Sequence, residues 1–185
     1  MSPLTQLLEA AFFAAAHPLS VAELARLQPD ASADEISGAL AELRRHYEEH
    51  GHAVELVEVA DGYQIVTRPR FAEAVAEAQL VRLPRKLSRA ALETVAVIAY
   101  RQPVSRAEIE EIRGVSVEGV LRSLQERGLV AVTSRGEGLG RPLLYGTTDL
   151  FLEHLGLKSQ DDLPRLDELS VALRPMGEMR GMSEM

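Results

Sequence analysis

HPLSVAEL, at residues 17–24, returns later in the chain as QPVSRAEI, at residues 102–109, and this repeat decides the fold. In both copies the proline ends one helix, because it cannot continue the backbone hydrogen-bond ladder, and the serine begins the next. A glutamate three residues after the serine gives the spacing of a capping box, in which each residue accepts a backbone amide of the other. The two predicted boxes are Ser20 with Glu23 and Ser105 with Glu108.

Helices are also predicted on both sides of the repeated motif. Apolar residues at helical spacing precede it, from Leu4 to Ala15 in the first copy and from Leu92 to Ala99 in the second. A third helix follows, with Ser32 and Ser116 as the expected N-caps. Each copy therefore predicts three consecutive helices.

Two β-strands are predicted after each third helix. Residues 54–67 read as a hairpin around Asp61-Gly62, a strong turn signal, and residues 129–146 as a hairpin around the glycine-rich loop 136–140. A short helix over 71–79 is expected to close the first unit. Three helices and then a hairpin are typical of the winged helix. We predict a mainly α protein with small β-hairpins (α+β), built from two tandem winged-helix domains.

The domain boundaries follow from the same pattern. We assign residues 1–80 to the first domain, 81–86 to a linker and 87–164 to the second domain. The second domain includes a closing helix over 149–155, which Gly156 ends. Residues 165–185 are rich in Met and contain Pro and Gly, so we expect a disordered tail.

The composition excludes several classes of protein. Hydrophobic residues make up 46% of the chain and aromatics only 4%, so the cores must consist mainly of aliphatic side chains. The chain has no cysteine, which excludes disulfide scaffolds, thiolate metal sites and cysteine nucleophiles. No apolar run approaches the roughly 20 residues of a membrane span, and the first residues lack the basic start of a secretory signal. We expect a cytoplasmic protein with no membrane partner.

The charge distribution argues against a dedicated DNA-binding protein. The formal net charge is −8, and only residues 84–147 are basic, with 10 Arg or Lys against 7 Asp or Glu. The first half of each third helix, where a winged helix would read DNA, carries acidic residues. Arg122 and Arg135 are the candidates for weak DNA contact. A winged-helix DNA-binding transcriptional regulator stays open as the alternative function.

Two short motifs suggest chemistry without a supporting context. His46 and His50 match H-x-x-E-H, with His52 close by, which would fit a zinc hydrolase; the polar end of a helix is the favoured interpretation. The glycine-rich loop lacks the spacing of a phosphate loop and reads as a wing. No nucleophile motif is present, so we expect no enzyme activity, no catalytic residues, no cofactor and no metal.

Phe13 is the candidate dimerisation residue. It lies off the apolar face on which its neighbour Phe12 is placed. Two interpretations are open: Phe13 packs under the hairpin of its own domain, or it is exposed and marks the first helix as an interface.

Several ungapped motifs follow one another through the second copy of the repeat. Residues 87–94 (LSRAALET), 98–109 (IAYRQPVSRAEI), 112–115 (IRGV), 127–129 (RGL) and 140–148 (GRPLLYGTT) resemble the segregation and condensation protein B (ScpB) family. The similarity runs to about Pro164. It departs from the pattern at Leu155, where an aromatic is usual, and at Gln160, where a leucine is usual.

The resemblance implies a function. Members form homodimers, largely through the first domain, and bind the kleisin ScpA, which bridges the SMC ATPase heads of the bacterial condensin. The expected role is in chromosome condensation and segregation, at the nucleoid, with DNA contact weak or indirect. Because Arg and Tyr are favoured at interfaces, we expect kleisin contacts in the second domain among the following residues. They are Tyr100, Arg101, Arg113, Arg141 and Tyr145.

Overall fold

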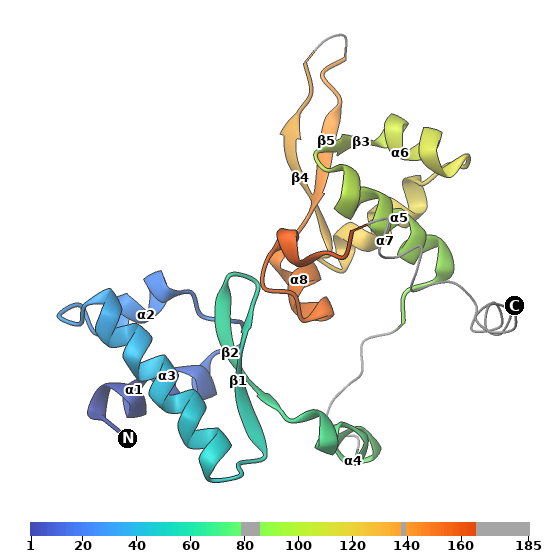
Figure 1. The fold of residues 1–185 in the computed structure, drawn as a ribbon. Coiled ribbons are helices and arrows are strands. Elements are labelled where there is room, and N and C mark those ends of the chain that lie inside the picture. Colours follow the sequence, from blue (N-terminus) through green and yellow to red (C-terminus); the bar gives the residue numbers. More distant parts are fainter. Residues whose placement is uncertain (79–85, 138–139, 166–185) are drawn as a thin grey trace, which may run out of the picture.

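The computed structural model describes residues 1–78, 86–137 and 140–165, and it shows the predicted repeat of three helices followed by a hairpin (Figure 1). The predicted linker and tail lie almost entirely outside these residues. The first unit consists of α1 (Pro3–Ala14), α2 (Val21–Leu27), α3 (Ala33–Glu49), β1 (Val54–Val59) and β2 (Gly62–Thr67). The second consists of α5 (Arg89–Arg101), β3 (Val104–Ser105), α6 (Arg106–Arg113), α7 (Glu118–Glu126), β4 (Val130–Arg135), β5 (Leu143–Thr147) and α8 (Asp149–Leu155).

The predicted capping boxes are confirmed in both copies. Ser105 Oγ accepts the amide of Glu108 at 3.3 Å, and the Glu108 carboxylate accepts the Ser105 amide at 2.8 Å. The equivalent boxes start α2 and α3. The N-cap predicted at Ser116 is wrong: α7 begins after Val117, whose amide donates to Glu110 at 3.1 Å. A side chain of the preceding helix thus replaces the local cap.

A third strand completes the sheet of the second unit. β3, within the repeated motif, pairs antiparallel with β5, which in turn pairs with β4. The first unit has the reduced equivalent, a single bridge in which Leu19 and Tyr63 exchange two backbone hydrogen bonds of 2.9 Å. The motif therefore places the start of its second helix against the hairpin in both copies.

The first hairpin turns one residue earlier than predicted. Val59 pairs with Gly62, so the two turn residues are Ala60 and Asp61, with φ of +48° and +53°. Gly62 opens β2 instead, where a Cβ would lie 3.0 Å from the backbone of Leu19. The Asp61-Gly62 pair predicted the hairpin correctly. The glycine, however, is required because the backbone of Leu19 lies close to it, and not because of the turn.

Each unit has its own hydrophobic core, so each can be stable as a domain. The first core is built mainly from the inner faces of α1, α2 and α3; it comprises Leu8, Phe12, Leu24, Ile36, Ala39, Leu40, Leu43, Tyr47 and Leu56. The second core includes Val95, Ile98, Ile109, Leu121, Leu124, Val130, Phe151 and Leu152.

The segments outside these cores are short. A 3-10 turn, η1 (Pro69–Phe71), leads into α4 (Ala72–Glu77), the helix expected to close the first domain, but none of the residues of α4 is buried. A second 3-10 turn, η2 (Gln160–Asp162), follows α8. Within the described residues, no helix is long and apolar enough to cross a membrane.

Candidate functional site

The outer side of α1 is an uncovered apolar surface. Five of its residues are exposed and apolar at helical spacing, and we refer to them as the α1 face: Pro3, Leu7, Ala10, Phe13 and Ala14. Phe13 is 90% exposed, so it does not pack under the hairpin of its own domain, and its role in dimerisation stays a prediction. The opposite side of α1 buries Leu8 and Phe12 in the first core. Within residues 1–78, 86–137 and 140–165, the first core therefore covers one side of α1 and leaves the α1 face exposed.

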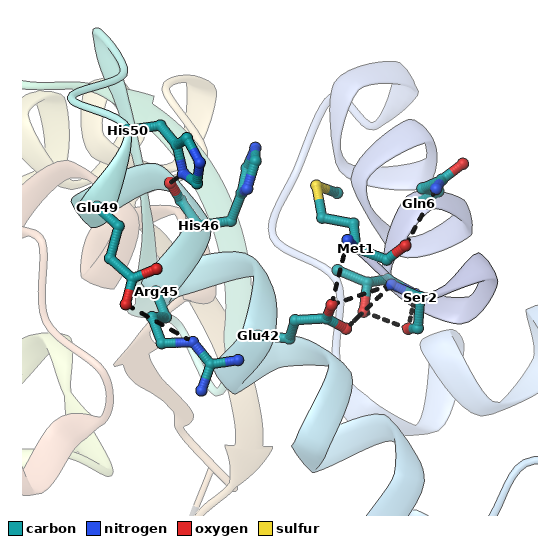
Figure 2. Close-up of polar contacts among 9 residues, drawn as sticks. Met1, Ser2, Gln6, Glu42, Arg45, His46, Glu49 and His50 are labelled. Carbon is teal, nitrogen blue, oxygen red and sulfur yellow. Dashed lines mark hydrogen bonds and ion pairs between the residues drawn. The ribbon is translucent and has the colours of Figure 1, made fainter.

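Polar contacts with α3 fix α1 and therefore orient the α1 face. Figure 2 shows Glu42 of α3 beneath the start of α1, where its carboxylate accepts the Ser2 amide at 3.0 and 3.2 Å and the hydroxyl of buried Thr5. The Met1 amino group lies 3.5 Å away. These donors, the Thr5 hydroxyl foremost, lower the pKa of Glu42 to about 2. Glu42 thus accepts hydrogen bonds at the N-terminus of α1 and stabilises that end of the helix.

We expect Glu42→Gln to destabilise the protein in a pH-dependent way. The folded-state pKa is below its ordinary value of 4.5, so the carboxylate stabilises the fold above that value and loses its contribution as pH falls towards 2. The gap in unfolding free energy between the native protein and the variant should be constant from about pH 6 to 7. It should shrink as the pH falls below about 4.5. Urea denaturation across this pH range measures the gap, and a gap that grows on acidification would contradict the assignment.

The histidines of the H-x-x-E-H motif lie together at the end of α3. The ring centroids of His46 and His50 are 4.3 Å apart, and that of His52 is 5.2 Å from His46 (Figure 2 shows the first two). His50 Nδ1 is also 3.0 Å from the carbonyl oxygen of His46. In residues 1–78, 86–137 and 140–165, no group of three or more His, Cys, Asp or Glu side chains is arranged to hold a metal ion.

An apolar groove of about 670 Å³ lies between α5 and α8 in the second domain. We call it the α5–α8 groove, lined by Lys86, Leu87, Leu92, Val95, Arg127, Leu129, Phe151, His154 and Leu155. Leu92 and Leu155 are each 54% exposed, which is unusual for two leucines facing one hollow. Lys86 and Arg127 give the groove basic residues beside its apolar lining. Such a groove fits a segment with apolar anchors and acidic flanks.

The five predicted kleisin contacts do not form one site, and none of them lines the groove. Arg101 and Arg141 are exposed, at the end of α5 and in the wing. Tyr145 belongs to the second core and is 9% exposed. Tyr100 donates its hydroxyl to the Pro164 carbonyl at 2.5 Å and so holds the segment after α8.

Arg113 joins α6 to α5. Its guanidinium donates to the Ala90 carbonyl at 3.1 Å, to the Thr94 hydroxyl at 2.5 Å and to the Glu93 carboxylate at 2.6 Å. Its side chain is only 14% exposed. These contacts position α5, one wall of the groove.

The two DNA candidates are both exposed. Arg122 of α7 lies 3.8 Å from Glu118, which also pairs with Arg106 of α6 at 3.8 Å, so a carboxylate accompanies both arginines. Arg135 lies at the end of β4, on the wing.

The α5–α8 groove was not predicted from the sequence, although two signals pointed to it. Leu92 was expected on the inner face of α5, but that face consists of Ala91, Thr94, Val95, Ile98 and Ala99, and Leu92 points to solvent. Leu155 stood out as a departure from the family pattern. Gln160, the other departure, donates to the Ala99 carbonyl at 2.6 Å and helps to hold η2 on α5.

Comparison with known proteins identifies relatives. The family model described as segregation and condensation complex subunit ScpB matches residues 6–166. Segregation and condensation protein B of Syntrophotalea carbinolica is 47% identical over 167 residues, covering 90% of this chain and 84% of that protein. That of Moorella thermoacetica is 45% identical over 174 residues, covering 94% and 88%.

Two solved structures are also similar to this chain. Crystalline ScpB from Mycobacterium tuberculosis is 35% identical and covers 83% of this chain and 95% of that one, with a TM-score of 0.39. A dimer of the ScpB N-terminal domain complexed with a ScpA peptide is 23% identical and covers 41% of this chain and 94% of that one, with a TM-score of 0.38.

Proposed function

The chain belongs to the ScpB family of segregation and condensation subunits, and we propose that it is a non-enzymatic adaptor that forms homodimers and binds the kleisin ScpA. Through ScpA it would join the SMC ATPase and support chromosome condensation and segregation at the nucleoid, in the cytoplasm. The observation that carries the proposal is the pair of uncovered apolar surfaces, one in each domain.

The α1 face is the proposed dimer surface. Its exposed residues carry no charge, and charged residues are depleted at the centres of interfaces. A two-fold axis beside α1 would bring the same face of both copies together, with Phe13 as the aromatic anchor. The hydrogen bonds of Glu42 at the start of α1 and of Tyr47 in its middle would hold the α1 face in one conformation before the partner binds.

The α5–α8 groove is the proposed ScpA site. A helical segment of ScpA would insert apolar side chains between Leu92 and Leu155, and acidic residues beside them would face Lys86. The exposed Arg101 and Arg141 are retained as proposed contacts. Arg113, Tyr100 and Tyr145 would act indirectly. Their side chains hold α5, the segment after α8 and β5, respectively, in place.

The binding experiment is a calorimetric titration of purified ScpA into the purified protein. The adaptor role predicts saturable binding with a negative heat-capacity change, the mark of apolar burial. Absence of binding at micromolar concentrations would refute the ScpA assignment.

We also expect weak DNA binding confined to the second domain. Residues 86–165 carry 11 Arg or Lys and 11 Asp or Glu, whereas residues 1–78 carry 5 and 13, so residues 86–165 should retard duplex DNA at low salt more than residues 1–78 do. Combined Arg122→Glu and Arg135→Glu changes should remove this retardation. Equal retardation of both domains in a gel-shift assay contradicts the prediction, and tight sequence-dependent binding at physiological salt would favour the transcriptional regulator.

A further inference from the structure

The turn of the first domain's hairpin contacts the second domain directly (Figure 1). The amide of Ala60 donates to the Leu157 carbonyl at 2.9 Å, and the amide of Asp61 donates to the Lys158 carbonyl at 2.7 Å. Lys158 Nζ lies 3.1 Å from the Glu58 carboxylate. Ala60 also packs against the second hydrophobic core, as Leu157 does. Two backbone hydrogen bonds, an ion pair and an apolar contact thus join the domains at one point.

The turn has an uncommon composition for its shape. Ala60 and Asp61 both have φ in the left-handed region, where two-residue hairpin turns favour Asn-Gly or Asp-Gly. Alanine has no side-chain polar group to offset that conformation locally. The same two residues donate the interdomain hydrogen bonds. Unfavourable backbone conformations persist where surrounding contacts hold them, and here those contacts come from the other domain.

Residues 157 and 158, whose carbonyl groups accept these hydrogen bonds, are held in place by contacts within the second domain. Gly156, with φ of +66°, ends α8 and lets the chain leave the helix. The Leu157 amide donates to Leu152 at 3.0 Å, and the Lys158 amide donates to Asp162 Oδ2 at 3.1 Å. The amide groups are therefore satisfied within the second domain. The carbonyl groups of Leu157 and Lys158 accept the incoming turn.

We propose that the Ala60-Asp61 turn is a docking element that holds the two winged-helix domains of one chain in a single orientation. Because α8 forms one wall of the α5–α8 groove, the docked turn also sets the direction of the groove relative to the α1 face. That second consequence rests on the proposed function, whereas the docking itself does not.

The chain has no cysteine, so labels can be introduced at chosen positions. Ala41→Cys on α3 and Gln125→Cys on α7 place spin labels on exposed sites of the two domains. The labelled protein is mixed with an excess of unlabelled protein, so that pulsed electron spin resonance reports distances within one chain. Docking predicts one narrow distance distribution. A broad distribution in the otherwise native sequence would overturn the proposal.

Charge changes test whether the contact between Lys158 and Glu58 keeps the two domains in one orientation. Lys158→Glu places a second carboxylate beside Glu58 and should broaden the distribution at least twofold. Adding Glu58→Lys to this variant should restore the narrow distribution. Arg89→Glu, the matched control, changes the net charge equally at an exposed ion pair and should leave the distribution narrow. If Lys158→Glu and Arg89→Glu behave alike, the contact does not hold the domains.

A disulfide tests the contact by capturing it, with the backbone hydrogen bonds kept and the Lys158–Glu58 ion pair removed. Asp61→Cys with Lys158→Cys should cross-link within one chain under mild oxidation, because the 2.7 Å backbone hydrogen bond brings the two residues within disulfide reach. Asp61→Cys with Glu111→Cys, on α6, is the control pair and should not. Cross-linking only between chains would overturn the proposal in favour of an exchanged contact in the dimer. A broad distance distribution in the otherwise native sequence, with ScpA binding intact, would refute the docking and leave the proposed function standing.

Discussion

Phe13→Glu is expected to convert the dimer into a monomer. Phe13 is 90% exposed in one chain, so the substitution removes no contact from the first core. At the centre of a dimer interface, however, it would remove a large aromatic anchor and bury a charge in its place. Losing such an anchor costs about 3 kcal/mol or more, which weakens dimerisation about 100-fold. Sedimentation velocity at a series of concentrations measures the shift.

The control for this variant is Ala41→Glu, which adds the same charge to an exposed position on α3 of the same domain. It should leave the dimer intact, and both variants should keep the helical circular dichroism of the native protein. If Phe13→Glu remains a dimer at the native dissociation constant, the α1 face is not the interface, and another surface must carry the association.

Combined Leu92→Glu and Leu155→Glu changes are expected to weaken ScpA binding without affecting the dimer. Each leucine is 54% exposed, so neither change empties the second core. Fully burying an exposed leucine side chain contributes about 1.5–3 kcal/mol, and about half of that is available to each half-exposed leucine, so losing both should weaken ScpA binding at least about 10-fold. Acidic residues would also repel the acidic flanks expected in the bound segment. Calorimetric titration with ScpA measures the loss.

Ile112→Glu supplies the matched control, because Ile112 is 53% exposed in the same domain but lies on α6, outside the groove. It should bind ScpA like the native protein. If Ile112→Glu and the groove variant weaken ScpA binding equally, the changes disturb the structure of the second domain in general and do not identify a binding site. Unchanged binding by the groove variant would place ScpA elsewhere.

Local signals in the sequence predicted most of the fold. The serine–glutamate boxes, the helix-ending glycine at 156 and the hairpin signal near Asp61 depend on residues a few positions apart, so they can be recognised without the structure. The errors concern contacts between one helix or strand and another. The cap of α7 comes from Glu110 of another helix, and β3 exists only because β5 lies beside it.

The candidate site was harder to predict, because it depends on how helices rotate and pack. Helical spacing places Leu92 near the inner face of α5, and only the packing against α6 and α7 decides that Thr94 turns inward and Leu92 outward. The groove also needs α8, which is distant in sequence. The sequence leaves two interpretations of Phe13 open for the same reason. The spacing of apolar residues along a helix does not show which parts of the protein cover that helix.

The most direct measurement is light scattering after size exclusion, first on the protein alone and then with ScpA. We expect a mass twice the 20.3 kDa of one chain, and a larger stable complex of fixed stoichiometry once ScpA is added. A monomer that elutes unchanged in the presence of ScpA would contradict both the dimer and the adaptor role.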